Sequence, residues 1–168
     1  MTINFTNILK DSLLKISQKE LSKIHKYKDA HKGEDCYFFG NGVSLKWFDF
    51  KEFSNKITIG ASHLPLHRSF NDLNARYLLL TEPFWFYPEL ITKYVTNSVS
   101  QPSLSKEYRN VIKNNPDTQF FLNLSNFLVI KSKNISFMFR DIIDPRLPAN
   151  FITNKISSFD GSLRVAIL

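Results

Sequence analysis

The stretch from residue 35 to residue 53 constrains the fold of this chain more than any other. It reads DCYFFGNGVSLKWFDFKEF, in which the apolar run 36–39 is followed at once by the glycine-containing turn 40–42. A short continuous apolar run bounded by turn residues is typical of a strand buried on both faces of a parallel sheet. Ser44 is suited to cap a following helix. The expected inward-facing side chains of that helix are Leu45, Phe48 and Phe53.

Further short apolar segments recur along the chain, and helical or polar stretches separate them. Strands are expected at residues 56–62, 77–80, 117–122, 127–131 and 135–139. Between them, residues 63–74 predict a loop or short helix, 84–95 an aromatic-rich helix interrupted near Pro88, and 105–114 another helix. Strands that alternate with helices predict an α/β, Rossmann-like fold with a mainly parallel sheet flanked by helices.

Residues 1–33 predict a basic amphipathic helix that precedes this domain. Its apolar face is spaced at steps of three and four, and it is expected to end near Ala30, before Gly33. No strand comes before it, so we expect it to pack across an edge or face of the domain at 34–168. The residues that set the spacing are Leu9, Leu13, Ile16, Glu20, Ile24 and Tyr27.

The formal net charge of +7 raises the question of an anionic partner. The basic residues of the N-terminal helix are lysines, which lack the bidentate fork that favours base or phosphate recognition, so nucleic acid is not the favoured partner. A solvated helix face is the favoured interpretation. The alternative is a surface that attracts an anionic substrate, RNA or acidic lipid headgroups, the last giving peripheral membrane contact.

Composition favours a cytoplasmic globular protein. The chain is 43% hydrophobic and 22% charged, which excludes a disordered polymer. It has a single cysteine, Cys36, which excludes an internal disulfide framework, and we expect its thiol to be buried and inert. No apolar run approaches the roughly 18 residues of a membrane-spanning helix, and residues 1–33 lack a signal-peptide pattern.

The last eight residues, GSLRVAIL, predict the first turns of an apolar helix with no stop signal. A half-helix of this kind would leave its apolar side chains unsupported. We therefore expect the domain to be incomplete at its C-terminus.

A glycine-rich turn between a strand and a helix has a use in anion binding. Glycine lets the backbone approach a ligand closely, and the helix start offers unpaired N–H groups and the positive end of the helix dipole. Ligands of parallel sheets bind at the carboxyl ends of the strands. Residues 40–42 are not part of G-x-G-x-x-G, since Leu45 stands at the third glycine position, and no Walker loop follows. A structural turn therefore stays open beside a binding loop. The candidates are Gly40, Asn41, Gly42 and Ser44 after the first strand, and Gly60 with Ser62 after the second.

The segments HKYKDAHKGE at 25–34 and CYFFGNGVSL at 36–45 resemble the opening of a bacterial protein family. Its members are the motility-accessory-factor-like surface-polysaccharide proteins related to archaeal-type 6-hydroxymethylpterin diphosphokinases. The same segments are similar to the nucleotide-binding start of bacterial CMP-sialic acid sialyltransferases. The strand at 57–62 resembles the second strand of these proteins, and DGSL at 160–163 is similar to a later helix start beside the nucleotide.

The resemblance implies a nucleotide or nucleotide sugar, with CMP-sugars favoured, as the ligand. In that case Gly40, Asn41, Gly42 and Ser44 contact its phosphate and ribose, and Gly161 and Ser162 approach the same ligand. Ser62 stands where the family commonly has asparagine, and Val43 where it has proline. In such sialyltransferases the catalytic histidine comes after the helix that begins at 160–163, so the resemblance supplies no catalytic residue within this chain.

Other side chains have competing interpretations. His63 and His67 are four residues apart, but Pro65 between them breaks the helical geometry of a zinc site. They are expected to be structural or exposed, although either is placed to act as an acid or base near the second strand. Asp141 and Asp144 fit turn capping better than Mg²⁺ binding. The aromatic run at 84–87 is expected in the core rather than as a sugar or lipid platform.

Three functions follow from these observations. The first is a glycosyltransferase-like, sialyltransferase-like domain that binds a nucleotide sugar in cell-surface polysaccharide synthesis and passes the sugar to a glycan acceptor. The second is a phosphoryl transferase of the pterin diphosphokinase type, which needs Mg²⁺ and ATP. The third is a binding domain of the same fold without catalysis. Dependence on Mg²⁺ separates the second from the first.

Overall fold

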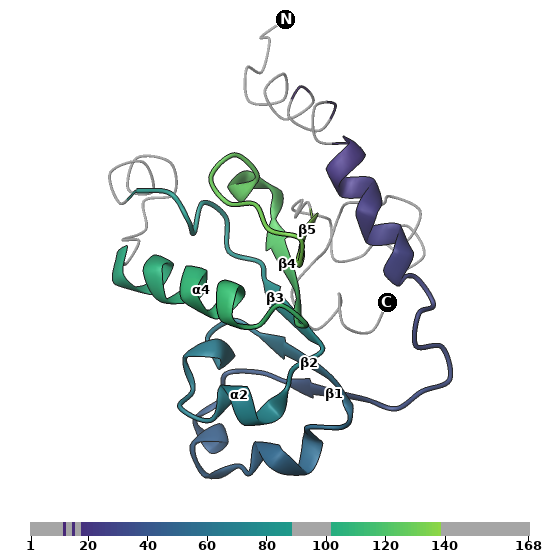
Figure 1. Cartoon of the computed structure of the whole chain (residues 1–168), viewed down its shortest axis with the longest axis vertical. Coiled ribbons are helices and arrows are strands. Elements are labelled where there is room, and N and C mark those ends of the chain that lie inside the picture. The colour runs from purple at the N-terminus through teal and green to yellow at the C-terminus, as the bar shows by residue number, and fades with distance from the viewer. Residues whose placement is uncertain (1–11, 13–14, 16–17, 89–101, 139–168) are drawn as a thin grey trace, which may run out of the picture.

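The computed structural model of the chain describes residues 12, 15, 18–88 and 102–138 (Figure 1). Its strands form one five-stranded sheet in the order β1-β2-β3-β4-β5, and every neighbouring pair is parallel. The predicted α/β, Rossmann-like parallel sheet flanked by helices is therefore confirmed. The strands are β1 (Cys36–Phe39), β2 (Ile57–Ala61), β3 (Tyr77–Leu80), β4 (Gln119–Asn123) and β5 (Ile135–Met138).

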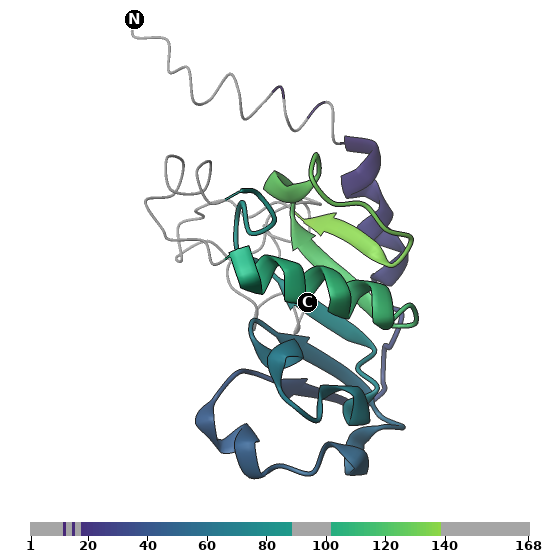
Figure 2. The same cartoon turned by 60° about the vertical axis from the view of Figure 1, so that its left-hand side comes forward.

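The described helices that connect the strands lie on one face of the sheet. Right-handed crossovers between parallel strands that follow one another in sequence order always place the connections on the same side. Figure 2 shows α4 crossing this face, with the shorter helices beside it. These elements are η2 (Val43–Trp47), η3 (Phe50–Phe53), η4 (Leu64–Leu66), α2 (Phe70–Leu73), α4 (Pro102–Asn114) and η5 (Leu124–Asn126).

The main hydrophobic core fills the space between the sheet and these helices. Alternate residues of a strand point to one face, so Leu78 and Phe120 enter this core from the two central strands and are fully buried. α4 contributes Tyr108 and Ile112, four residues apart on one helical face. The large apolar side chains that the composition supplies thus fix α4 against β3 and β4.

The N-terminal segment packs at the β5 side of the sheet. Its described residues are helical at 18–22 and continue as η1 (Lys23–Tyr27), which contacts β5. Ile24 and Tyr27 pack against a smaller core on the second face, and Gly33, at a φ of 84°, ends the following turn. That smaller core consists of Ala61, Leu79, Phe121 and Met138.

β1 lies at an edge of the described sheet, which corrects the expectation that it is buried on both faces. Of its side chains only Phe39 is buried, whereas Phe38 is 37% exposed. Cys36 is exposed as well, so the expectation of a buried thiol is wrong. Partial desolvation nevertheless raises the pKa of the Cys36 thiol, which keeps it protonated at neutral pH.

Two further expectations are wrong in their local structure. The single helix after β1 is replaced by η2 and η3, because the Asp49 carboxylate accepts a hydrogen bond from the Lys51 backbone N–H at 3.0 Å and starts a new turn. The strand expected at 127–131 is absent, since the N–H groups of Val129 and Ile130 both donate to the Asn126 carbonyl instead of to a neighbouring strand. The described part of 84–95 begins as a turn.

Gly60 in β2 is required by close packing. A Cβ built there meets Leu64 Cδ2 at 2.5 Å and Leu78 Cδ1 at 2.7 Å, and both leucines are fully buried. We expect Gly60→Ala to lower the free energy of unfolding by about 1–3 kcal/mol, as overpacking does elsewhere. Urea unfolding followed by circular dichroism measures this. Gly40→Ala is the matched control, because nothing lies within 4 Å of its added Cβ; equal stability of the two variants contradicts the packing argument.

Candidate functional site

The loops that follow the parallel strands meet at one edge of the sheet. The register pairs Phe39 with Gly60, Ala61 with Leu79, and Leu80 with Leu122. The residues just after each strand are therefore neighbours, and residues 40–44, 62–63, 81–87 and 124–126 share this carboxyl edge. The strand order does not reverse among the described strands, so they contain no topological switch point of the kind where dinucleotides bind.

The loop after β1 presents the predicted glycines and polar side chains at this edge. Asn41, Gly42 and Ser44 are exposed. No described residue forms a hydrogen bond with the side chain of Asn41 or Ser44. The predicted cap is wrong, since Gly42 rather than Ser44 is the N-cap of η2, and no side chain caps it. η2 is a five-residue 3-10 helix, so a long helix dipole does not contribute to anion binding here.

The two glycines of this loop are not required by packing among the residues that the structure describes. An added Cβ at Gly40 meets nothing within 4 Å, and one at Gly42 meets only Ser44 Oγ at 3.6 Å. Gly42 has φ −66° and ψ 152°, a conformation that any residue adopts. The glycines therefore leave the loop backbone open to a neighbouring molecule.

The loop after β2 places Ser62 and His63 in a hydrogen-bonded chain with Tyr108 of α4. Ser62 has a φ of 53°, and its N–H donates to the Leu79 carbonyl at 3.1 Å. The Tyr108 hydroxyl donates to the Ser62 carbonyl at 2.9 Å and lies 3.0 Å from Nδ1 of His63. The His63 ring is exposed and packs on Trp85, with ring centroids 5.6 Å apart. Ser62 and His63, both considered from the sequence, are thus each linked to Tyr108 at this edge.

Tyr108 is the buried member of this chain. It is fully buried, and burial together with the negative charge of Glu82 raises its pKa well above the ordinary value of 10.0. Its hydroxyl therefore keeps its single proton at neutral pH. Nearby, the indole Nε1 of Trp85 is a buried donor without a hydrogen-bond partner among the described residues.

The loop after β4 holds the loop after β3 in place. Asn126, fully buried, accepts a hydrogen bond from the Phe86 N–H at 3.0 Å and donates to the Glu82 carbonyl at 3.3 Å. Ser125 Oγ accepts from the N–H of Phe84 at 2.8 Å. Phe84 has a φ of 56°, which is strained for a bulky residue and costs on the order of 1–3 kcal/mol. Such strain persists where surrounding contacts fix it, and it is concentrated at functional sites.

Arg109 adds a second support to this loop from α4. Its Nη2 donates to the Phe86 carbonyl at 3.1 Å, and its Nη1 donates to the Val129 carbonyl at 3.2 Å. The sequence reasoning missed Tyr108, Arg109 and Asn126, because none of them lies in a motif. The inward-facing spacing of α4 is the only signal that could have indicated Tyr108, and buried asparagines leave no sequence pattern.

The remaining sequence candidates lie apart from this chain of contacts or outside the described residues. His67 packs edge-on against Phe50 at 4.9 Å, and its Nδ1 accepts from the Ser69 N–H at 3.2 Å. The described residues contain no group of three or more His, Cys, Asp or Glu placed to hold a metal ion. The candidates outside the described residues are Asp141, Asp144, Gly161 and Ser162.

The aromatic run at 84–87 divides between two environments. Phe86 is buried in the main core, as expected of the run as a whole. Trp85 is half-buried and packs edge-on against Tyr108 at 5.2 Å, so it joins the core to the carboxyl edge. Phe84 and Tyr87 are also only half-buried.

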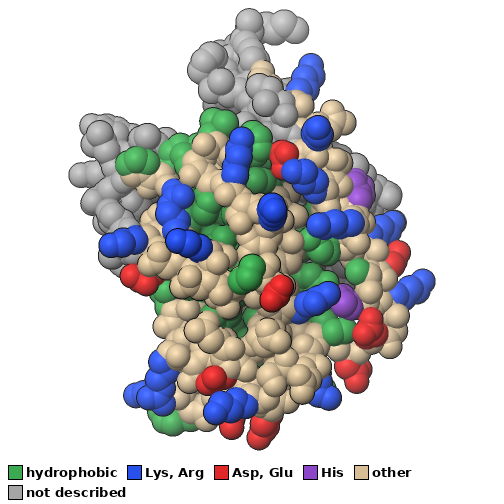
Figure 3. All heavy atoms as spheres, in the orientation of Figure 1, with side chains coloured by type: hydrophobic (Ala, Val, Ile, Leu, Met, Phe, Trp, Pro, Cys, Tyr) green, Lys and Arg blue, Asp and Glu red, His purple; other side chains and the backbone are tan. Residues whose placement is uncertain are grey.

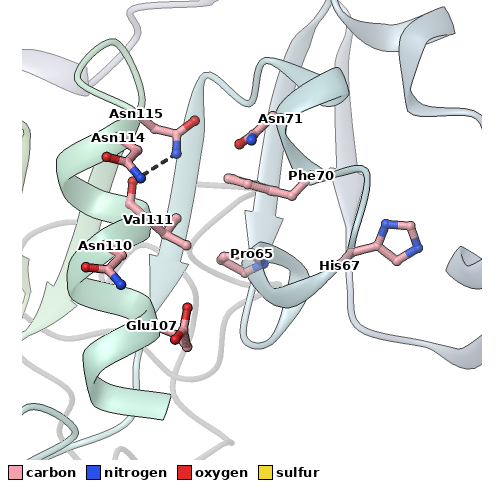
Figure 4. A pocket seen from close by; sticks show the side chains of 9 residues that line it. All are labelled: Pro65, His67, Phe70, Asn71, Glu107, Asn110, Val111, Asn114 and Asn115. Carbon is pink, nitrogen blue, oxygen red and sulfur yellow. Dashed lines mark hydrogen bonds between the residues drawn. The ribbon is translucent and has the colours of Figure 1, made fainter. Parts of the chain in front are cut away.

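A shallow groove of about 170 Å³ lies between α4 and the η4–α2 segment (Figure 4). Asn110 and Asn114 line it from α4, and Pro65 and Asn71 line it from the opposite side.

Basic side chains are spread over the face of the molecule shown in Figure 3, with acidic side chains among them. In the part of the chain that the structure covers, no helix has the length and apolar character needed to cross a membrane.

The raised pKa of Tyr108 predicts a loss of stability in alkali. Below the ordinary value of 10.0, both the folded and the unfolded chain keep this proton. Above it the unfolded chain releases the proton first, so the free energy of unfolding falls as the pH rises. Melting temperatures between pH 8 and about pH 11 measure the decline, and we expect it to be shallower for Tyr108→Phe. Parallel declines in the two proteins mean that Tyr108 ionises normally.

Comparison with known proteins gives no relative. No protein-family model matches the chain, and neither does any curated protein or solved structure.

Proposed function

We propose that the chain binds a nucleotide-linked sugar at the carboxyl edge of β1 and β2, as a glycosyltransferase-like domain of cell-surface polysaccharide synthesis. The single observation that supports this most is the open loop after β1. Among the described residues, its glycines meet no packing need, and its polar side chains at Asn41 and Ser44 have no partners. A cytoplasmic location, where nucleotide sugars are made and used, belongs to the same proposal.

The residue types suit the phosphate and ribose of such a ligand. Glycine at positions 40 and 42 would let phosphate oxygens approach the loop backbone closely, because no Cβ intervenes. The Asn41 amide and the Ser44 hydroxyl both donate and accept hydrogen bonds, which matches ribose hydroxyls and phosphate oxygens. Ser62 lies on the neighbouring strand end, within the same edge. CMP is the favoured nucleotide, on the resemblance of residues 36–45 to sialyltransferases.

The test is a thermal-shift measurement of the full chain with CMP, CDP, UDP, GDP and ATP, each with and without Mg²⁺. A ligand at about 100 times its dissociation constant stabilises the folded state by about 2.7 kcal/mol. We expect CMP to raise the melting temperature without Mg²⁺. The double variant Gly42→Val, Ser44→Ala should lose the shift while keeping its fold, since the backbone of Gly42 suits valine.

Asn41→Ala and Asn110→Ala form a matched pair for this test. Both remove an exposed asparagine amide, one from the proposed loop and the other from the groove beside α4. The proposal expects Asn41→Ala alone to weaken the CMP shift. A shift lost only in Asn110→Ala assigns the nucleotide to the groove. A shift that needs Mg²⁺ and ATP favours phosphoryl transfer, and the absence of any shift contradicts nucleotide binding.

A further inference from the structure

We infer that His63 is the acid–base residue of this edge, held by Tyr108 in the tautomer that carries its proton on Nδ1 and leaves Nε2 free. The substrate in this inference, a hydroxyl-bearing acceptor, is taken from the proposed function. The geometry is taken from the hydrogen bonds around His63.

The tautomer follows from a count of protons along the chain of contacts. The Tyr108 hydroxyl has one proton, and the Ser62 carbonyl is an acceptor only. Because the carbonyl can only accept, the 2.9 Å hydrogen bond between it and the Tyr108 hydroxyl uses that proton. The hydroxyl oxygen is then an acceptor toward His63, so the atom 3.0 Å away, Nδ1, must carry a hydrogen. Neutral imidazole has one N–H, and Nε2 is therefore a bare lone pair.

The alternative arrangement leaves a backbone group without a partner. If the Tyr108 proton pointed to His63, the Ser62 carbonyl would lose its donor, since no other described residue donates to it. The arrangement in which both contacts of the Tyr108 hydroxyl are hydrogen bonds has one more hydrogen bond and is therefore the more favourable. The left-handed conformation of Ser62, at φ 53°, accompanies the contact of its carbonyl with Tyr108. The strained residue and the buried tyrosine thus act together on His63.

The free nitrogen is available to a ligand. Nε2 of His63 has no hydrogen bond to any described residue, and the side chain is exposed. The His63 ring packs beside both Trp85 and Tyr108, at centroid distances of 5.6 and 6.5 Å, and these two rings also contact each other. The negative charge of Glu82 acts on the Tyr108 hydroxyl. His63 comes two residues after the end of β2, beside the strand end that carries Gly40 and Asn41.

These positions suit one proton transfer. An acceptor hydroxyl oxygen forms a bond to the anomeric carbon of the nucleotide sugar, and its proton passes to Nε2 of His63. The bond from the anomeric carbon to the phosphate oxygen breaks, and its electron pair leaves with the nucleotide. The imidazolium then returns the proton to water, because the side chain is exposed. Tyr108 touches no substrate in this step, and it is a positioning residue.

Nuclear magnetic resonance of the full chain tests the tautomer directly. Long-range proton–nitrogen correlation at neutral pH distinguishes the two tautomers of each histidine, and His63→Gln assigns the signal. We expect His63 to be protonated on Nδ1. His67 is the internal control in the same sample, since its Nδ1 accepts from the Ser69 N–H and its proton must lie on Nε2. In Tyr108→Phe, His63 should lose the fixed tautomer while His67 keeps its own.

Steady-state kinetics test the acid–base role of His63, with release of CMP from CMP-sialic acid as the reaction that is measured. General-base removal lowers kcat by about 100-fold or more, so we expect His63→Gln to lose this much with KM little changed. His67→Gln should keep its rate. A His63 signal with its proton on Nε2, or one that Tyr108→Phe leaves unaltered, overturns the inference, and so does an unchanged kcat in His63→Gln. A wild-type chain that neither binds nor cleaves the donor contradicts the proposed function. The acid–base role of His63 is then contradicted as well, even if nuclear magnetic resonance shows the expected tautomer.

Discussion

The parallel pairing of five strands in sequence order is the constraint on which the rest of the structure depends. Parallel strands end at the same edge, so short loops far apart in the sequence become neighbours there. Because the strands follow one another in sequence order, right-handed connections lie on one face of the sheet, and α4 therefore packs over β3 and β4. As a result a helix residue, Tyr108, reaches the loop after β2 from a position 46 residues further along the chain.

The carboxyl edge combines an open part with a rigid part. At β1 and β2, Asn41, Ser44 and His63 are exposed, and the side chains of Asn41 and Ser44 have no hydrogen-bond partner among the described residues. At β3 and β4, buried Asn126 and the guanidinium of Arg109 hold a loop that contains a strained Phe84. A site of this kind needs both parts, since adaptable groups bind a ligand well only when a rigid neighbour positions them. The buried polar network thus supports the exposed one.

The sequence predicted the strands best, because apolar runs bounded by turn residues depend on local chemistry. The strand at 77–80 agrees residue for residue with β3, and those around 36–39 and 135–139 agree closely. Local hydrogen bonds that leave no sequence pattern were missed. The Asp49 side chain divides the helix after β1, and the backbone carbonyl of Asn126 accepts from the N–H groups of Val129 and Ile130, which keeps those residues out of a strand. The glycine loop was found from its composition, whereas the contact between Tyr108 and Ser62 depends on how α4 packs and leaves no local trace.

The central claim is that the loop after β1 and the start of the loop after β2 form one ligand site. Backbone amide shifts of the nitrogen-15-labelled full chain, recorded during a titration with CMP, test it most directly. The account predicts that the largest shift changes fall on Gly40, Asn41, Gly42, Ser44, Ser62 and His63, from two segments that only the fold brings together. Changes confined to Asn71, Asn110 and Asn114, which line the groove beside α4, or no saturable change at all, would contradict it.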